Sequence, residues 1–342
     1  MEENGLSIDI SEGIEPGNLK IKVLTTNDTS ATLQTNPKFK EMVVQPGPAA
    51  AAFIGEHGLA VYIEFNDGST THAILFDTGG VNSSILHNAN PMSIKLSNCE
   101  HVIISHGHFD HTGSLAKLIP TLNAGSDIII HPLAYIQNQV AITRTGEDIP
   151  LEDFVKSLRE LKKSGQIILE TKLPAMDKNA IESAAVKQSV KLVETTQPSA
   201  LYPGIATSGE IELFDPSEVT PGFYLLSGKN QVEKHTFRDE IALYFNVNGK
   251  GLVVLTGCGH AGINNIIRHG QKLTGIDTIY AIIGGFHTEM TSGPNIDTII
   301  EHIEAFNPRI VCGMHCTGLQ FQAKMLGHDA HVQGVTGTEF RL

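Results

Sequence analysis

Apolar residues along this chain gather in short runs, and polar turns that contain glycine separate them. Runs of this kind, some alternating and some continuously apolar, are typical of strands buried on one or both faces. Asn66, Asp67 and Gly68 separate two of the runs, and Asn248 and Gly249 separate two others, which predicts two β-hairpins. The predicted strands cover residues 19–25, 59–65, 71–76, 127–130, 241–245, 251–255, 278–283 and 309–311.

Segments with a helical period follow several of these strands, at residues 84–87, 114–119, 263–271 and 296–306. Repeated strand–loop–helix units predict an α/β fold whose chemistry lies at the ends of strands. Each half of the chain begins with strands and continues with strand–helix units. The sequence therefore predicts a four-layer αβ/βα sandwich, in which two sheets pack face to face and helices cover the outer faces.

Two segments differ in texture from the rest of the chain. Residues 1–18 are polar and acidic, which predicts a flexible tail before a single domain at 19–342. Residues 136–232 include stretches rich in lysine and glutamate with a helical period, at 151–163 and 179–187. We interpret this segment as a helical insertion, or cap, on the sandwich.

Charge and composition exclude several classes of partner. The 342 residues include 37 acidic and 24 basic side chains, a net charge of −13, and no long basic run, which argues against a nucleic-acid partner. No signal segment and no apolar stretch of membrane-spanning length is present, so we expect a cytoplasmic protein without a membrane partner. The four cysteines are too few for a disulfide scaffold and fit free thiols in a reducing compartment. The oligomeric state is left open.

The most informative motif follows the apolar residues 102–104 directly. It reads Ser-His-Gly-His-Phe-Asp-His-Thr-Gly-Ser and places His106, His108, Asp110 and His111 close together in sequence. Imidazole nitrogens and carboxylate oxygens bind zinc, manganese or iron, and a turn at a strand end can direct several of them to one point. The alternatives are a histidine-rich surface loop or a structural metal site, but structural zinc sites are usually closed by cysteines.

Two neighbouring metal ions need about six to seven protein ligands, so other turns must supply the rest. Cys258 lies between two glycines after the strand at 251–255, where a thiolate ligand is a stronger interpretation than a small buried side chain. His235 precedes the hairpin and is either a ligand or a solvated loop residue. His260, His287 and His315 each follow a strand near glycines, and they compete for the last place.

The order His-x-His-x-Asp-His resembles the signature of the metallo-β-lactamase superfamily. The resemblance implies that the first two histidines, His106 and His108, bind one metal and that Asp110 and His111 bind a second. In metallo-β-lactamases a histidine before a similar hairpin completes the first site, and a cysteine after the hairpin binds the second metal. The same roles are implied here for His235 and Cys258. The superfamily's closing histidine, from the turn after the final strand, implies His315.

Further motifs are similar to one branch of the superfamily, whose namesakes are 7,8-dihydropterin-6-methyl-(ribofuranosyl)aminobenzene-phosphate synthases. This resemblance implies that His260 and His287 lie behind the ligands or against the substrate, with His260 as the replacement if His235 does not bind. Asp77 is expected to orient the ligand histidines through hydrogen bonds. The motifs are Glu-His-Gly-Leu at 56–59, Phe-Asp-Thr-Gly at 76–79, Gly-Cys-Gly-His-Ala-Gly at 257–262, Gly-Gly-Phe-His at 284–287 and His-Cys-Thr-Gly at 315–318.

We expect a pair of divalent metal ions, above all zinc, with manganese or iron as the alternative metals. Such a pair predicts hydrolysis by an activated water molecule. Asp110 is then the catalytic residue as well as a ligand, because it accepts a hydrogen bond from that water. We expect a small-molecule amide or ester as substrate, including a cyclic lactam or lactone. The alternatives are a pterin-precursor synthase or transferase, which the absence of a glycine-rich phosphate loop and an arginine cluster disfavours, and a catalytically silent metal-binding regulator.

Overall fold

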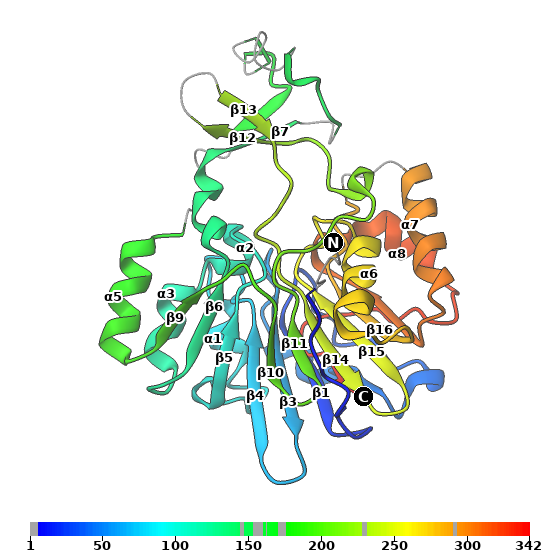
Figure 1. The fold of residues 1–342 in the computed structure, drawn as a ribbon. Helices are drawn as coiled ribbons and strands as arrows, with labels where there is room; N and C mark the ends of the chain where they lie inside the picture. Colours follow the sequence, from blue (N-terminus) through cyan, green and yellow to red (C-terminus); the bar gives the residue numbers. More distant parts are fainter. Residues whose placement is uncertain are drawn as a thin grey trace.

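Two large β-sheets form the body of the protein in the computed structural model (Figure 1). The structure describes residues 6–143, 147–152, 160–161, 163–169, 176–227, 231–289 and 293–342. The eight-stranded sheet has the order β2 (Val43–Val44), β18 (Glu339–Arg341), β1 (Leu19–Thr25), β3 (Ala60–Asn66), β4 (Thr71–Phe76), β5 (Cys99–Ile103), β6 (Asp127–Ile130) and β9 (Lys191–Glu194). The six-stranded sheet has the order β10 (Ser199–Tyr202), β11 (Ile205–Thr207), β14 (Leu243–Val247), β15 (Gly251–Thr256), β16 (Ile279–Gly284) and β17 (Ile310–Gly313).

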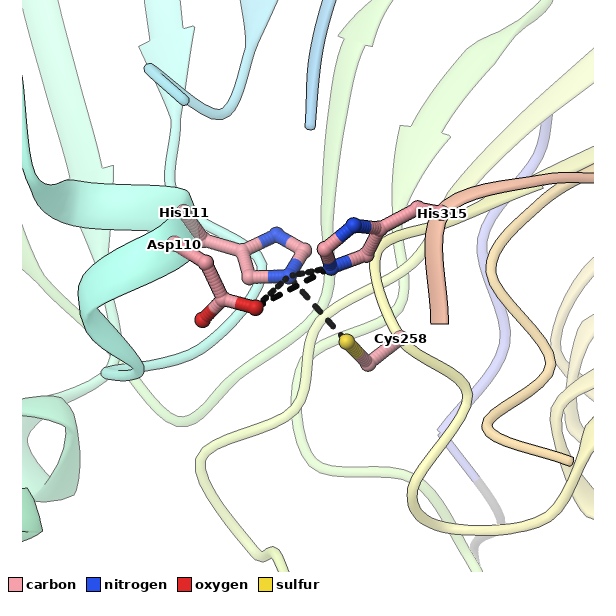
Figure 2. A group of neighbouring side chains, drawn as sticks. All are labelled: Asp110, His111, Cys258 and His315. Carbon is pink, nitrogen blue, oxygen red and sulfur yellow. Dashed lines mark hydrogen bonds and ion pairs between the residues drawn. The ribbon is translucent and has the colours of Figure 1, made fainter. Parts of the chain in front are cut away.

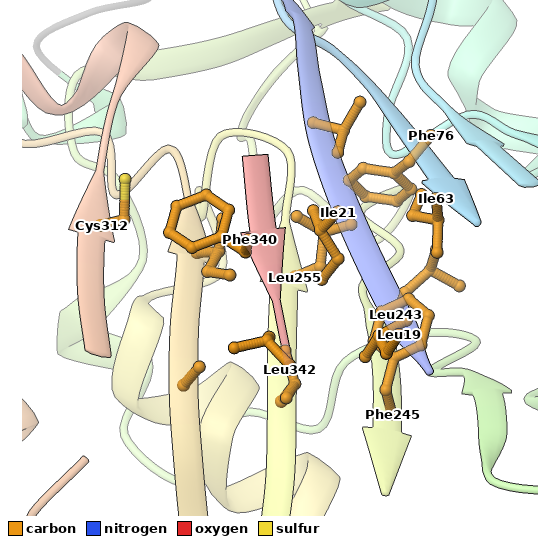
Figure 3. Packing of buried hydrophobic residues seen from close by; sticks show 14 of the residues in the cluster. Leu19, Ile21, Ile63, Phe76, Leu243, Phe245, Leu255, Cys312, Phe340 and Leu342 are labelled. Carbon is orange, nitrogen blue, oxygen red and sulfur yellow. The ribbon is translucent and has the colours of Figure 1, made fainter. Parts of the chain in front are cut away.

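The two sheets pack through a continuous apolar core, drawn in part in Figure 3. Leu19 and Ile21 on β1 and Ile63 on β3 face Leu243 and Leu255 of the other sheet, and all five side chains are fully buried. Along β1 every second residue from Leu19 is buried, because successive side chains of a strand point to opposite faces. The alternation in the sequence therefore selects the face that enters the core.

Helices cover the outer face of each sheet, which confirms the predicted four-layer αβ/βα sandwich (Figure 1). The eight-stranded sheet is covered by α1 (Ser84–Asn88), α3 (Leu115–Leu118) and α5 (Lys178–Gln188), and the six-stranded sheet by α6 (Ile263–Thr274), α7 (Gly293–Ala305) and α8 (Gly318–Met325). The remaining described helices are short: α2 (Phe109–Thr112), η1 (Pro37–Phe39), η2 (Gly47–Ala52), η3 (Leu96–Asn98), η4 (Ile119–Thr121), η5 (Pro132–Gln139), η7 (Pro216–Glu218) and η8 (His315–Thr317).

The segment 136–232 is divided between the sandwich and a small third sheet. The third sheet has the order β13 (Gln231–Lys234), β12 (Phe223–Ser227), β7 (Val140–Thr143) and β8 (Ile167–Leu169), and it rises above one edge of the sandwich (Figure 1). Between these strands the chain returns to the body, where β9 pairs with β6 and α5 packs on the outer face. The predicted insertion therefore contains core elements, and its described outlying part is a sheet. Of the predicted helix at 151–163, residues 153–159 and 162 lie outside the described residues.

The N-terminal segment packs on the six-stranded sheet, whereas the sequence predicted a flexible tail at 1–18. Ile10 and Ile14 are buried, and the backbone N–H of Ile8 donates to the carbonyl of Leu273 at 2.8 Å. Ile14 also forms a bridge with Val247 of β14. These apolar residues alternate with acidic ones, so the segment has one face that the sheet can bury; residues 1–5 lie outside the described part.

None of the helices in the described part of the chain combines the length and the apolar character that crossing a lipid bilayer requires.

Candidate metal centre

Five strand ends meet at one edge of the sandwich and carry most of the polar side chains predicted for the site. Asp77 follows β4, His106 follows β5, Cys258 follows β15, His287 follows β16 and His315 follows β17. Because β4–β5 and β15–β16–β17 are parallel pairs, their carboxyl ends lie on the same side of each sheet. Parallel strands of α/β proteins place functional groups at this edge.

Close approach of the two sheets at this edge depends on a glycine. Gly257 precedes Cys258, and a Cβ atom at Gly257 would collide with the side chain of Ser105, which follows β5. Any larger residue would push the β5 turn and the β15 turn apart. The Gly-Cys-Gly sequence thus has a steric reason as well as a chemical one.

The first group of converging side chains contains Asp110, His111, Cys258 and His315, all buried (Figure 2). One ligand atom from each lies within 4.8 Å of all the others. The Nε2 atom of His111 is 3.1 Å from the Cys258 sulfur and 3.2 Å from Nε2 of His315. Asp110 Oδ2 is 3.1 Å from the same His315 nitrogen.

Hydrogen bonds on the other side of the two rings fix which nitrogen carries the proton. His111 Nδ1 lies 2.6 Å from a carboxylate oxygen of Asp77, which can only accept, so Nδ1 donates. His315 Nδ1 faces the side-chain oxygen of Asn27 at 3.0 Å and donates in the same way. In the neutral rings both Nε2 atoms then carry a lone pair. These two atoms face each other, the Asp110 carboxylate and the Cys258 sulfur. A cation between these electron-pair donors removes their repulsion, so the donor set fits a divalent metal ion.

A second group lies beside the first and shares Cys258 with it. His108 Nδ1 is 3.0 Å from Nε2 of His106 and 3.2 Å from Nε2 of His260. The ligand atoms of His106, Cys258 and His260 lie within 4.8 Å of one another. The Cys258 sulfur thus belongs to both groups, and the two groups of candidate ligands adjoin.

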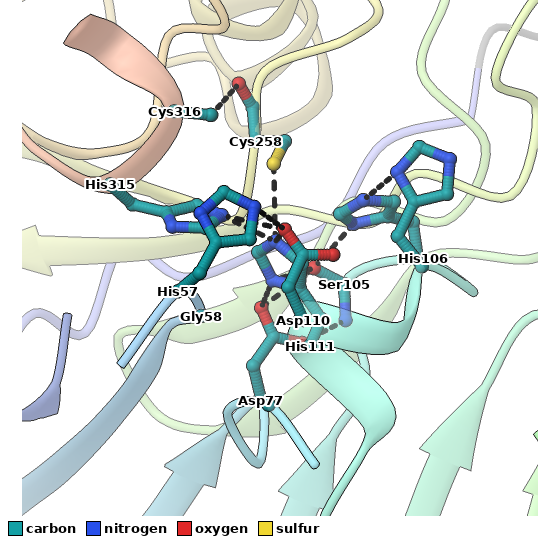
Figure 4. A network of polar contacts seen from close by, with 12 residues as sticks. His57, Gly58, Asp77, Ser105, His106, Asp110, His111, Cys258, His315 and Cys316 are labelled. Carbon is teal, nitrogen blue, oxygen red and sulfur yellow. Dashed lines mark hydrogen bonds and ion pairs between the residues drawn. The ribbon is translucent and has the colours of Figure 1, made fainter. Parts of the chain in front are cut away.

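Asp77 reaches one imidazole in each group (Figure 4). The Ser105 hydroxyl donates to Asp77 Oδ2 at 2.7 Å, and its oxygen then accepts from His106 Nδ1 at 2.9 Å. The same carboxylate accepts from His111, so it orients both rings and leaves both Nε2 atoms free for a metal. This is the role that the sequence predicted for Asp77.

Burial keeps most of these imidazoles in the neutral form that binds metals. It lowers the pKa of His108 to about 4 and lowers the pKa values of His106, His260 and His315 as well. Burial also opposes the charge of Asp110, but the surrounding histidines outweigh it and hold the Asp110 pKa well below its usual value. His111 is the exception, because burial is outweighed there by the nearby carboxylates of Asp77 and Asp110, which raise its pKa.

Cys258 differs from the carboxylate because burial raises the pKa of its thiol well above the usual value. The carboxylates of Asp110 and Glu240 act in the same direction as burial, so a thiolate here needs a positive partner. A metal ion would supply this, since a thiol releases its proton to solvent or a base when it coordinates a metal.

His235 lies outside both groups. Its ring stacks on Phe237 at 4.1 Å between centroids, and Phe237 stacks in turn on His260 at 4.1 Å. The backbone N–H of Phe237 donates to Nδ1 of His235 at 2.9 Å. The structure thus separates His235 from the cluster by an aromatic ring and brings in His260, the alternative that the sequence left open. Sequence spacing does not reveal which of these side chains faces inward.

His287 borders the second group without joining it. Its ring centroid is 4.1 Å from that of His260, and its Nδ1 atom is buried with no hydrogen-bond partner among the described residues. The backbone φ angle of His287 is 43°, an unusual value for a residue with a side chain. His287 therefore lies beside the second group of candidate ligands, and it also lines a cleft.

Two further residues were not predicted for the site. His57 has a 56% exposed side chain, and its Nε2 lies 3.3 Å from Asp110 Oδ2; its motif entered the sequence analysis only through a resemblance. Glu240 is fully buried and accepts the backbone N–H groups of His260 and Ala261 at 2.9 and 2.6 Å. Burial raises the Glu240 pKa to about 7. The sequence feature that could have indicated Glu240 is the acidic pair Asp239–Glu240, which directly precedes the apolar run at 241–245.

A cleft of about 220 Å³ opens onto the cluster. The small third sheet forms part of its wall through Ile142 on β7 and Phe223 on β12, so this sheet covers the site. The other described lining residues are His57, His108, Phe109, Asp110, Cys258, His287, Glu289 and Cys316.

Comparisons with known proteins agree with this fold and site. The family model of the metallo-β-lactamase superfamily matches residues 54–172. A 7,8-dihydropterin-6-methyl-4-(β-D-ribofuranosyl)-aminobenzene-5'-phosphate synthase from Methanocaldococcus jannaschii is 30% identical over 275 residues, 78% of this chain and 83% of the synthase. The chain therefore belongs to the metallo-β-lactamase superfamily, in the same branch as this archaeal synthase. Proteins of this superfamily bind divalent metals, and the chain has candidate ligands for them.

Two other similar proteins cover nearly the whole chain. An uncharacterised protein from the same archaeon is 25% identical over 83% of this chain and 93% of its own length. The crystal structure of Tm1679, a metal-dependent hydrolase of the β-lactamase superfamily, has a TM-score of 0.64 and 22% identity, covering 95% of this chain and 99% of that chain. The second likeness shows a shared fold.

Proposed function

We propose that this protein is a metal-dependent hydrolase that cleaves a small amide or ester, including a cyclic lactam or lactone. The observation that carries the proposal is the convergence of buried lone pairs in two adjoining groups. His106, His108 and His260 would hold one divalent ion, and Asp110, His111 and His315 would hold the other, with Cys258 available to both. Zinc suits this mixture of nitrogen, oxygen and sulfur ligands. When bound, the ions would activate a water molecule and polarise the carbonyl oxygen of the substrate.

Asp110 and His57 supply a route for the proton that hydrolysis releases. Asp110 Oδ2 faces the cluster and can accept a hydrogen bond from a water molecule in the cleft. The same oxygen is 3.3 Å from Nε2 of His57, whose side chain is 56% exposed. A proton accepted at Asp110 can therefore pass to His57 and from there to solvent.

The walls of the cleft favour a small substrate with an apolar body. Phe109, Ile142 and Phe223 contribute apolar surface, and a volume of about 220 Å³ is below that of typical drug-sized pockets. Glu289 is exposed at the lining, and no lysine or arginine occurs among its described residues. These features favour an uncharged amide or ester over a phosphorylated substrate.

An activity screen of the zinc-loaded protein tests the proposal. We expect turnover of a lactam, lactone or thioester, and loss of that turnover in Asp110→Asn, which keeps the size of the side chain but removes its charge. Absence of bound metal after zinc supplementation would contradict the proposal. If the protein turned over none of the substrate classes but bound a ligand tightly, the result would favour a catalytically silent metal-binding regulator.

A synthase reaction is the second candidate, and the archaeal relative favours it. That protein is named as a synthase, is 30% identical, and shares 83% of its length with this chain. The corresponding test offers the same zinc-loaded protein a dihydropterin that carries a leaving group on its 6-methyl carbon and a ribofuranosyl aminobenzene phosphate, whose amine displaces that group and releases a proton. Product formation without any hydrolysis of the screened compounds would replace the first proposal with this one.

A further inference from the structure

A second, larger chamber lies beside the cleft, between η7 and the helices α6 and α7. Its volume is about 360 Å³, which is within the range of small-molecule sites. Thr220 and Pro221, which precede β12, contribute to its wall on the side of the third sheet.

The chamber adjoins the metal cluster through His287. The His287 side chain lines both the cleft and the chamber. Cys258 lines the cleft, and Gly259, which follows Cys258 in the chain, lines the chamber. The residues on either side of His287 are fixed, since the backbone N–H of Phe286 and the hydroxyl of Thr288 both bond to Thr317. His287 is therefore part of the boundary that the cleft and the chamber share.

The charges around the chamber disfavour an anion. None of the described lining residues is lysine or arginine, whereas Asp215 and Glu218 are carboxylates. The N-terminus of α6 could stabilise an anion, but the carboxylate of Glu218 already occupies this position. Glu218 accepts there from the side chain of Asn264 at 2.7 Å and from the backbone N–H of Asn265 at 3.3 Å, and His302 lies 3.2 Å from it.

The remaining lining combines apolar walls with hydrogen-bonding oxygens. Ile263, Phe286 and Ile299 give apolar surface, and the carboxylates of Asp215 and Glu218 accept hydrogen bonds but cannot donate them when ionised. A ligand that satisfies both features has an apolar body and carries N–H donors. A carboxylate or phosphate at the same place meets repulsion from both carboxylates, and His302, which also lines the chamber, already faces Glu218.

We propose that this chamber is a substrate subsite for an uncharged apolar group that carries N–H donors, such as an aromatic carboxamide. The inference rests on the proposed function, because the subsite holds the non-reacting part of the substrate of the metal centre. It adds a selectivity that the metal ligands do not provide. A ring with a neutral donor group is accepted, and the same ring with an anionic group is rejected.

Benzamide and benzoate are matched probes, because they share a ring and differ in donor capacity and charge. Binding to the zinc-loaded protein is followed by ligand-detected NMR in the wild type and in Ile299→Trp, which fills the chamber without touching the cluster. Asn295→Trp places the same bulk at an exposed lining position, in case the first variant does not fold. Val186→Trp is the control, since Val186 is 82% exposed on α5.

We expect benzamide to bind the wild type and Val186→Trp equally and to lose roughly tenfold or more in affinity in the two chamber variants. Benzoate can bind metal ions through its carboxylate, and we expect its affinity to be the same in both chamber variants as in the wild type. The inference is overturned if benzamide does not bind, if the chamber variants leave its affinity unchanged, or if they weaken benzoate instead. Benzamide binding in the chamber without turnover of any screened substrate would refute the proposed function and leave the subsite standing.

Discussion

The two ends of strand β4 carry the same kinds of side chain and use them differently. At the carboxyl end, Asp77 binds Nδ1 of His111 and leaves Nε2 facing other lone-pair donors. At the amino end, His72 has a carboxylate on each nitrogen, with Glu100 at 2.8 Å and Asp67 at 3.1 Å. The pKa of His72 is raised, because these carboxylates outweigh the effect of burial.

The difference shows that the partner of the second ring nitrogen decides what a histidine does. Where the second nitrogen also meets a carboxylate, the imidazole is stabilised as a cation and serves as a link in the structure. Tyr202 of the other sheet donates to Glu100 at 2.7 Å, so the amino end of β4 joins the two sheets. The second nitrogen of His111 faces the Cys258 sulfur and Nε2 of His315, so this imidazole is a candidate metal ligand even though carboxylates raise its pKa too. Residue type and burial alone do not make this distinction.

Removing the carboxylate at the centre of the cluster should have the largest effect. In Asp110→Ala we expect turnover to fall by roughly a thousandfold or more, because a ligand and a proton acceptor are lost together. The measurement is kcat/KM on the substrate that the screen identifies, with circular dichroism to verify folding. Asp67→Ala, at the other end of β4, should retain turnover, and a similar loss there would contradict the comparison.

The two histidines that flank the β14–β15 hairpin should differ in metal content. We expect His260→Ala to retain about one equivalent of zinc and His235→Ala to retain about two, because Phe237 separates His235 from the cluster. Mass spectrometry under native conditions and elemental analysis measure the content. Retention of both ions in His260→Ala, with loss of one in His235→Ala, would show that the ligand set assigned from the structure is wrong.

Asp77→Asn tests the hydrogen bonds that orient the ligand rings. The backbone of Asp77 has a φ angle of 61°, which asparagine also tolerates, so the variant changes the side chain without forcing the backbone. We expect metal affinity to fall by roughly 10- to 100-fold. Competition with a zinc chelator measures it. Glu100→Gln at the amino end is the control and should leave metal affinity unchanged.

The smallest effect is expected at His72, and it depends on pH. Because the folded-state pKa of His72 is raised above its ordinary value of 6.5, its stabilisation is complete below that value while the carboxylates stay ionised. It is lost as the pH rises through the raised pKa. The difference in unfolding free energy between wild type and His72→Gln should be roughly 1 kcal/mol or less near pH 6 and should shrink towards pH 9. Urea titrations at both pH values test this, and a difference that grows with pH would refute it.

Local patterns in the sequence were sufficient for much of the framework. The strands β1, β4 and β6 have the predicted bounds, because apolar side chains and turn residues delimit them within a few positions. The ligand motif at 106–111 was visible for the same reason, since its residues share one turn and one short helix. The third sheet and the packed N-terminal segment were missed, because their strands gain stability from partners far away in the chain.

The sequence by itself determined which chemical groups are present and that they stand at the ends of strands. It also determined the order of elements that requires a four-layer sandwich, since periodicity and turn chemistry act over short distances. Only the tertiary structure placed His260 beside His106 with Phe237 between His260 and His235, brought His57 against Asp110, and set Cys258 between the two groups. These outcomes depend on how separate strand ends approach one another, and the approach is decided by packing between residues that are distant in sequence.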